Sequence, residues 1–202
     1  VVGNNVYAHV PDIKDFTLSL RELIKENGVI SLEFPHLMRL IEKIQFDTIY
    51  HEHFSYLSLT TVNLIFEEAD LEIFDVEELE THGGSLRIYG SMKNSLHKKN
   101  SSVENMLEEE KSFGIKNLNT YENFQEKANN IKNNLIKLLI DLKNKNKKVM
   151  AYGAAAKGNT LLNYAGIKRD LISYVFDKAE SKQGKYMPGS HIPILHPKEI
   201  FN

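Results

Sequence analysis

Residues 29–35, Val-Ile-Ser-Leu-Glu-Phe-Pro, form a short apolar run with β-branched side chains that ends at a proline, and such a run predicts a strand. Before this run, Asp12 is placed to cap a helix whose apolar residues continue toward Asn27-Gly28. Residues 1–2 predict the end of an earlier buried strand that enters a loop at Gly3. Strand, helix and strand at this spacing predict a βαβ unit of a parallel sheet.

Polar residues follow both of these strands. Asn4, Asn5 and His9 come after the first strand, and Glu33 stands near the end of the second. Ligands of parallel sheets lie at the carboxyl ends of the strands, so these residues are candidates for ligand contact.

The chain continues with a helical stretch at residues 37–43 and a further helix that Thr60 or Thr61 is placed to cap. Residues 71–76 and 84–89 then predict a pair of strands. Residues 93–116 are charged and weakly apolar, with one short helix near residues 103–111 and a break at glycine 114. We expect this region to begin a connector.

The last part of the chain predicts a second α/β unit. Residues 148–152, 172–176 and 192–195 predict strands, residues 159–165 a helix, and residues from 196 onward a terminal helix. A long helix precedes this unit, and its apolar residues recur at steps of three and four. A coiled coil is the competing interpretation, but the strand that follows at once favours packing on a sheet. The recurring apolar residues are Tyr121, Phe124, Ala128, Ile131, Leu135, Leu138 and Leu142.

The stretch FDTIYHEHFSY, residues 46–56, brings together four groups that can hold or move a proton: Tyr50, His51, Glu52 and His53. A loop at this place would gather three of them around a small substrate. A surface turn with two solvated histidines remains the alternative, because histidine is the usual acid or base near neutral pH without being always catalytic. A metal site that also uses His9 is not expected, since zinc needs three or four ligands at a defined spacing.

The turn GAAAKG, residues 153–158, follows a predicted strand and precedes a helix, which is the context for anion binding by backbone N–H groups. It departs from the dinucleotide motif G-x-G-x-x-G at Ala155. Tyr152, Lys157 and Asn159 favour a nucleotide-diphosphate site over a tight turn without ligand. Asp177 lies 24 residues beyond Gly153, near the place of a ribose-binding acid.

The loop KQGKYMPGSHIPI, residues 182–194, lies past the second strand of this unit. Lys182, Lys185 and Tyr186 are candidates there for a second phosphate or sugar contact. An exposed basic loop without ligand is the alternative.

Composition limits the possible functions. The chain has 202 residues, 42% of them hydrophobic and 26% charged, and this length fits one large domain or two small ones. The net charge of −2 argues against nucleic acid or an anionic membrane as the main partner. The absence of cysteine excludes disulfides and thiolate metal sites, and we expect a cytoplasmic protein. The chain opens on an apolar run without methionine, which favours a fragment of a longer protein over processing or trimming.

Four separated motifs, FDTIYHEHFSYLSL, ETHGGSLRIYG, VMAYGAAAKGNTLLNY and KQGKYMPGSHIPI, resemble the S-adenosylmethionine-dependent C-methyltransferases of nucleotide-linked keto-sugars, the tetronitrose type among them. This resemblance implies an α/β fold with a partial class I methyltransferase (Rossmann-like) sheet, followed by a second Rossmann-like α/β domain. The expected domains are the methyltransferase part at 1–92, a helical connector at 93–147 and a nucleotide-sugar-binding domain at 148–202.

The resemblance also implies a reaction. A methyl group would pass from S-adenosylmethionine to a carbon beside the ketone of a dTDP-linked 4-keto-deoxysugar. His53 would remove the proton, Tyr50 and His9 would lie beside the enolate, and Glu52 would orient the base; Tyr50 remains an alternative base. The residues expected to bind substrate are Tyr152, Gly153, Lys157, Gly158, Asn159, Asp177, Lys182, Lys185, Tyr186 and His82.

The cofactor site is expected to be incomplete in this chain, where Asn4 and Asn5 would contact S-adenosylmethionine from one side only. Two other functions stay open. One is a non-catalytic nucleotide-sugar-binding module, in which GAAAKG binds and residues 50–53 are inert. The other is a fragment of a nicotinamide-dependent oxidoreductase, which the alanine at position 155 makes the weaker alternative.

Overall fold

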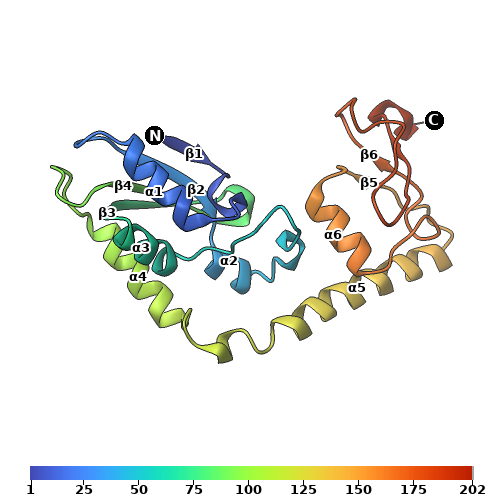
Figure 1. Ribbon diagram of the computed structural model, residues 1–202. Coiled ribbons are helices and arrows are strands. Elements are labelled where there is room, and N and C mark those ends of the chain that lie inside the picture. Colours follow the sequence, from blue (N-terminus) through green and yellow to red (C-terminus); the bar gives the residue numbers. More distant parts are fainter. Residues whose placement is uncertain (202) are drawn as a thin grey trace. The chain divides into compact units, whose positions relative to one another are not determined.

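The computed structural model describes residues 1–201, which divide into two compact units (Figure 1). Unit 1 comprises Val1–Gln45 and His51–Asn123, and unit 2 comprises Phe46–Tyr50 and the chain from Phe124 onward. Each unit contains its own sheet and helices, so the fold is α/β as expected. The change of unit at Asn123 falls inside the expected connector, and the three predicted domains remain a prediction.

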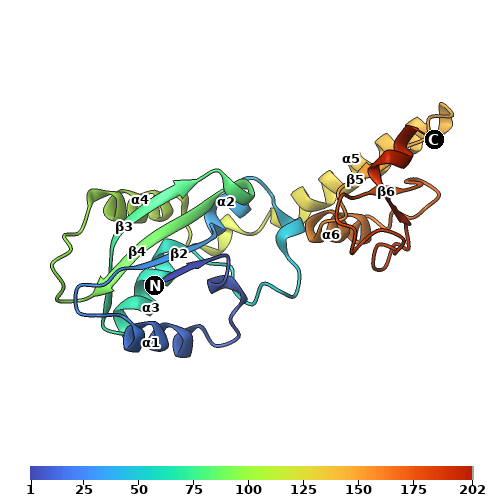
Figure 2. The same cartoon turned by 90° about the horizontal axis from the view of Figure 1, so that it is seen from above.

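Unit 1 is built on a four-stranded mixed sheet, whose strands lie side by side in Figure 2. Their spatial order is β1 (Val2–Asn4), β2 (Ile30–Pro35), β4 (Ser85–Met92) and β3 (Leu71–Leu79). β1 and β2 are parallel, whereas β4 is antiparallel to both of its neighbours. The predicted βαβ unit and the predicted strand pair are therefore confirmed, and they belong to one sheet.

One expectation about this sheet is wrong. The strand at the start of the chain was expected to be buried, but Val2 is 76% exposed. β1 lies at the edge of the sheet and pairs with β2 alone. The strongly buried strands are β2 and β4, where Leu32, Phe34 and Ile88 are fully covered.

The α-helices of unit 1 are α1 (Ile13–Leu23), α2 (Leu37–Glu42), α3 (Leu59–Glu68) and α4 (Ser101–Phe113). α3 and α4 lie beneath β3 in Figure 1 and pack against it and against each other. The predicted cap of α1 is confirmed, because Asp12 Oδ1 accepts the Asp15 N–H at 2.9 Å.

The start of α3 differs from the prediction. The helix begins at Leu59, and its cap is Ser58 rather than Thr60 or Thr61. Ser58 Oγ accepts the Thr61 N–H at 3.1 Å. The helix starts earlier than expected because a carboxylate from α4 takes its first N–H groups.

That carboxylate belongs to Glu110, whose side chain is fully buried. Oε1 accepts hydrogen bonds from the Leu59 N–H at 2.6 Å and from His36 Nε2 at 2.7 Å. Oε2 accepts from the Thr60 N–H at 2.8 Å and from the Thr60 hydroxyl at 2.5 Å. A negative charge at the start of a helix is favourable, because the N–H groups there lack partners within the helix.

The pKa of Glu110 results from two opposing effects. Burial by itself raises it, but the hydrogen bonds from His36 and Thr60 outweigh burial and lower it below its ordinary value of 4.5. The carboxylate is therefore the stable form in the fold. Because a carboxylate only accepts, His36 Nε2 is the donor in their contact.

Unit 2 contains two longer helices and a three-stranded parallel sheet. The helices are α5 (Phe124–Asn144) and α6 (Ala156–Tyr164). The strands β5 (Ala151–Tyr152), β6 (Val175–Phe176) and β7 (Ile194–Leu195) lie side by side in this order. The three predicted strands are confirmed, although each has only two residues in the ladder, and a 3₁₀ helix at Pro197–Phe201 replaces the expected terminal helix.

The long predicted helix is confirmed as α5, but its buried residues differ in part from the predicted ones. Ala128 is buried as expected, whereas Leu138 is 54% exposed and the next residue, Leu139, is buried in its place. Leu139 packs into the core of unit 2 with Leu162, Val175 and other apolar residues. Among residues 1–201, no helix is both long and apolar enough to cross a bilayer.

Replacement of Glu110 by alanine is expected to lower the free energy of unfolding by about 3–5 kcal/mol, because it leaves buried donors of α3 and His36 without their acceptor. Chemical denaturation measures this change. Glu108→Ala is the matched control, since Glu108 on the same helix is exposed and pairs with exposed Lys111; it should change stability by less than about 0.5 kcal/mol. Equal effects of the two substitutions would contradict this role of Glu110.

The same carboxylate predicts a dependence of stability on pH. A carboxyl group whose pKa is lowered in the fold stabilises it above the ordinary pKa of 4.5, and this contribution is lost as the pH falls through the folded value. The unfolding free energy of the wild type should therefore fall more steeply on acidification below about pH 5 than that of Glu110→Gln. Parallel pH profiles for the two proteins would contradict the lowered pKa.

Candidate functional site

A buried tyrosine anchors the loop that follows β1. This loop forms the short 3₁₀ helix η1 (Tyr7–His9), and Tyr7 is fully buried. Its ring contacts those of Phe16, Phe34 and Phe66, with centroid distances of 5.9, 6.1 and 6.4 Å. The anchor fixes the position of the next two residues, Ala8 and His9.

The Tyr7 hydroxyl is satisfied within this core. It lies 2.7 Å from Thr17 Oγ1, and that oxygen donates its own proton to the Ile13 carbonyl at 2.7 Å. The Tyr7 O–H is therefore the donor to Thr17. Burial raises the pKa of Tyr7 to about 12, which keeps the hydroxyl neutral.

Ala8 joins this loop to residues 51–56. Its carbonyl oxygen accepts the Phe54 N–H at 2.9 Å and the Ser55 N–H at 3.2 Å. Ala8 is itself buried. Two backbone donors on one buried acceptor hold the two loops together and bring their histidines into contact.

His9 and His53 lie next to each other. Their ring centroids are 4.8 Å apart, and the ring planes meet at 68°. The ring of Tyr56 meets His53 at 6.1 Å and 88°. Tyr56 was not among the expected site residues, although it stands three positions after His53 in the same aromatic stretch, which is the signal that points to it.

The other residues of the histidine stretch are placed differently. His51 and Glu52 are exposed. Tyr50 belongs to unit 2, together with the 3₁₀ helix η2 (Phe46–Thr48). The change from unit 2 to unit 1 falls between Tyr50 and His51, so the place of Tyr50 beside His53 remains a prediction.

Within unit 2, residues 46–50 are held by α6. The buried ring of Phe46 contacts Tyr164 at 5.1 Å. The Tyr164 hydroxyl in turn bonds Gln125 Nε2 at 2.6 Å and Asn129 Oδ1 at 2.5 Å, both on α5. The segment that ends at Tyr50 is thus fixed to the helix that begins in the GAAAKG turn.

The turn Thr81–Gly84 lies at the same edge of the unit 1 sheet as the carboxyl end of β2, because Pro35 pairs with Ser85. His82 is exposed and has a left-handed backbone with φ 55°. Gly84 has φ 131°, and a Cβ there would lie 2.8 Å from Arg39 Cβ, so only glycine fits. The turn presents His82 to solvent on a fixed backbone.

The side chain of Glu33 is hydrogen-bonded to this turn. Its side chain is nearly buried, and its two carboxylate oxygens accept from the Thr81 hydroxyl at 3.0 Å and from Arg87 Nη2 at 2.9 Å. The Gly83 carbonyl of the turn also accepts a hydrogen bond from Lys43 Nζ at 2.8 Å.

The two expected cofactor contacts lie at the carboxyl end of β1. Asn4 is exposed and pairs with Glu33 in the sheet register. Asn5 has a left-handed backbone with φ 55°, and its N–H donates to the Glu33 carbonyl at 2.8 Å. Contact of these two residues with a cofactor remains a prediction.

The GAAAKG turn of unit 2 differs in part from the expected form. α6 begins at Ala156, three residues earlier than predicted, so Lys157 and Gly158 lie in its first turn. Ala155 occupies the N-cap position and contributes no side-chain cap. Gly153 has φ 96°, and apart from its chain neighbours no heavy atom of the described residues lies within 4 Å of the place where its Cβ would stand. Open space before an uncapped helix start is compatible with anion binding.

Asn159 adds a polar atom to this helix start. Its Oδ1 is buried, and it has no hydrogen-bond partner among the residues that the structure describes. Tyr152 at the end of β5 and Tyr186 in the loop after β6 are 60% and 61% exposed. Lys185 is also exposed. The side chains of Tyr152, Lys185 and Tyr186 are therefore accessible to a ligand.

Asp177 and Lys182 tie the turn after β5 to the loop after β6. The Asp177 carboxylate accepts the Ala154 N–H at 2.7 Å and the Ala179 N–H at 2.8 Å. Lys182 Nζ donates to the Ala154 carbonyl at 2.8 Å and lies 3.3 Å from Asp177 Oδ2. The N–H groups of Ala179 and Ala154 lower the pKa of Asp177. This geometry gives both side chains a structural task, and their expected substrate contacts remain predictions.

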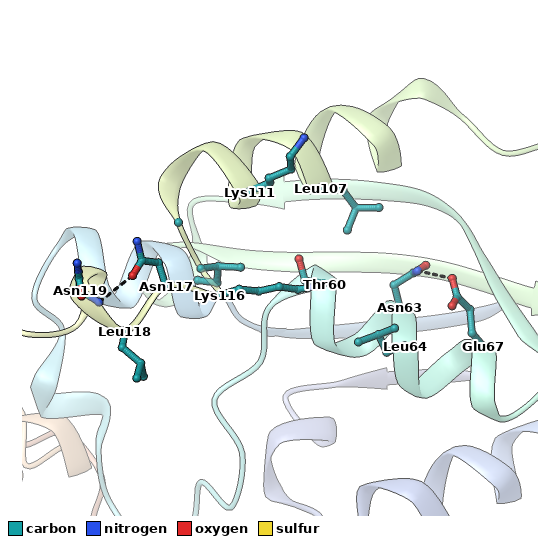
Figure 3. Close-up of a pocket in the computed structure, with 12 residues that line it drawn as sticks. Thr60, Asn63, Leu64, Glu67, Leu107, Lys111, Lys116, Asn117, Leu118 and Asn119 are labelled. Carbon is teal, nitrogen blue, oxygen red and sulfur yellow. Dashed lines mark hydrogen bonds between the residues drawn. The ribbon is translucent and has the colours of Figure 1, made fainter.

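A groove of about 890 Å³ lies between α3 and α4 in unit 1 (Figure 3). Leu64, Leu107 and Leu118 contribute its apolar lining. The polar groups around it bond one another, as in the pair Asn63–Glu67 at 2.6 Å. The expected site residues lie outside this lining, and within residues 1–201 no group of three or more acidic or histidine side chains is arranged to hold a metal ion.

Two comparisons with known proteins bear on this chain. Residues 80–202 match the family described as C-methyltransferase C-terminal domain. The chain is 36% identical over 199 residues to the C-methyltransferase NovU of Streptomyces niveus, and the match covers 98% of this chain and 47% of NovU. The chain thus spans about half the length of this curated relative.

Replacement of Asp177 by alanine is expected to loosen the turn at Ala154 and the loop at Ala179. Each of these N–H groups loses a charged acceptor, a loss that corresponds to about ten- to hundredfold faster amide exchange. Hydrogen exchange followed by NMR or mass spectrometry measures it. The control is Asp170→Ala, because Asp170 is exposed and pairs with exposed Lys143. Unchanged exchange at Ala154 in the Asp177 variant would contradict the tie.

Proposed function

The chain belongs to the C-methyltransferase family, and we propose that it takes part in transfer of a methyl group from S-adenosylmethionine to a carbon beside the ketone of a dTDP-linked 4-keto-deoxysugar. The observation that carries this proposal is the contact between His9 and His53, with ring centroids 4.8 Å apart. Two imidazoles on anchored loops supply a base and a hydrogen-bonding group at one place.

The first chemical step is removal of a proton. The ketone makes the neighbouring C–H acidic, and the electrons left behind move onto the ketone oxygen to form an enolate. In the proposal, an imidazole nitrogen of His53 accepts the proton, because a histidine near neutral pH suits this task. Tyr50 is the alternative base.

The remaining residues support this step. In the proposal His9, whose ring lies 4.8 Å from that of His53, hydrogen-bonds the developing enolate oxygen, and such preorganised donors favour a transition state in which charge develops. Tyr50 shares this role in the proposal, and Glu52 orients the base.

S-adenosylmethionine would supply the methyl group that the enolate carbon accepts. The exposed amide of Asn4 and the neighbouring Asn5 fit one side of a polar cofactor at the carboxyl end of β1. The sheet order supports this assignment, since a parallel pair continued by antiparallel strands is how the sheet of a class I methyltransferase ends.

In the proposal, unit 2 binds the nucleotide part of the substrate. The uncapped start of α6, with Lys157 and Gly158 in its first turn, suits a diphosphate. Exposed Tyr152 and Tyr186 are available to stack on the base, and Lys185 to pair with a phosphate.

The test is exchange of the sugar C–H with solvent. The chain is incubated in heavy water with a dTDP-linked 4-keto-deoxysugar, and deuterium at the carbon beside the ketone is followed by NMR. His53→Asn should slow this exchange about 10²–10⁴-fold, because it removes the base. His97→Asn is the control, since His97 stacks on Phe74 in another part of unit 1.

Three outcomes decide between the functions. Loss of exchange in His53→Asn, with normal exchange in His97→Asn, supports the proposal. Unchanged exchange in that variant removes His53 from the role of base. Tight binding of the nucleotide sugar by the wild type without any exchange would favour a non-catalytic binding module instead.

A further inference from the structure

Tyr56 lies in a short segment of unit 1 that is held at both ends. At its start, the Ser55 N–H donates to the buried Ala8 carbonyl at 3.2 Å. At its end, the Leu57 carbonyl accepts the Leu37 N–H at 2.8 Å. The backbone of Tyr56 is therefore fixed on both sides, and its side chain starts from a defined position.

The ring of Tyr56 meets the imidazole of His53 at a defined angle. The centroids are 6.1 Å apart and the planes meet at 88°, within the range of edge-to-face aromatic contacts. His9 contacts the same imidazole at 4.8 Å and 68°. His53 is thus bounded by two rings that come from different loops.

A histidine base needs such neighbours. Rotation about the last side-chain bond of histidine is broad and has no sharp preference of its own. This rotation decides where the ring nitrogens point, and a base works only when its nitrogen reaches the proton in the correct geometry. Turning the His53 ring would disturb its contacts with both His9 and Tyr56.

We propose that Tyr56 is a positioning residue that holds the imidazole of His53 in the orientation needed for proton abstraction. The aromatic ring carries this role, and the hydroxyl is not required. The inference rests on the proposed function of His53 as the base. It goes beyond that function by adding a residue that never touches the substrate.

A purely structural role predicts a different result. Tyr7, the anchor of the neighbouring loop, is fully buried, whereas Tyr56 is only partly buried. Loss of the Tyr56 ring should therefore leave the fold intact and change the rate of proton removal. Loss of a packing residue would instead lower the thermal midpoint.

The experiment uses residues 1–202 and the deuterium exchange of a dTDP-linked 4-keto-deoxysugar. Tyr56→Leu should slow exchange about ten- to hundredfold, as expected for a misplaced catalytic group, with the dissociation constant of the sugar nucleotide changed by less than about twofold. Tyr56→Phe keeps the ring and should stay within about threefold of the wild-type rate. Tyr89→Leu is the matched control, because Tyr89 lies on β4 beside Phe74.

The outcomes separate this inference from the proposed function. If exchange is normal in Tyr56→Leu and lost in His53→Asn, the role of Tyr56 is overturned and the proposed function stands. If exchange is retained in His53→Asn, the proposed function is overturned. Equal losses in Tyr56→Phe and Tyr56→Leu would assign the effect to the hydroxyl and overturn the ring contact. Weaker substrate binding that accounts for the slower rate would also overturn it. Tyr56→Met replaces the leucine variant if that variant does not fold, with the same expected result.

Discussion

The buried carboxylate of Glu110 is the contact on which the architecture of unit 1 depends. It comes from α4, yet it accepts the first N–H groups of α3 and the Nε2–H of His36, at the junction of β2 and α2. A buried charge is tolerated only where its hydrogen bonds are complete, and here four donors surround two oxygens. One side chain thus fixes the end of β2 and the start of α3, and the segment with His53 and Tyr56 leads directly into that helix start.

The histidine pair is built on backbone and core contacts rather than on the histidines themselves. Tyr7 is buried among three phenylalanine rings and fixes the loop of His9, and the Ala8 carbonyl then binds the loop of His53. Apolar packing therefore determines the distance between two polar rings. The loops of both imidazoles are thus held by groups that take no part in the proposed chemistry.

Unit 2 uses a similar principle with a charged group. Asp177 and Lys182 satisfy the N–H and the carbonyl of Ala154, so the turn before α6 has a fixed shape without a ligand. The same turn leaves the start of α6 uncapped and Gly153 facing open space. Residues 46–50 belong to this unit through Phe46 and Tyr164, which links the chain just before the histidines to the helix that begins at the turn.

The sequence by itself determined the order of strands and helices, because apolar spacing, Asp12 as a cap and the proline at the end of β2 are local signals. It also singled out His9 and His53, whose chemistry is visible in their residue types. Only the tertiary structure decided that these two rings touch, that Tyr56 completes the contact, and that Tyr50 belongs to the other unit. The same holds for Glu110, which lies 51 positions after Leu59 in the chain and reads locally as one more charge on a polar helix. The reason is physical. Propensity and periodicity act over a few residues, whereas a carboxylate reaches the start of a helix distant in sequence, and two rings on separate loops meet, only when packing brings them together.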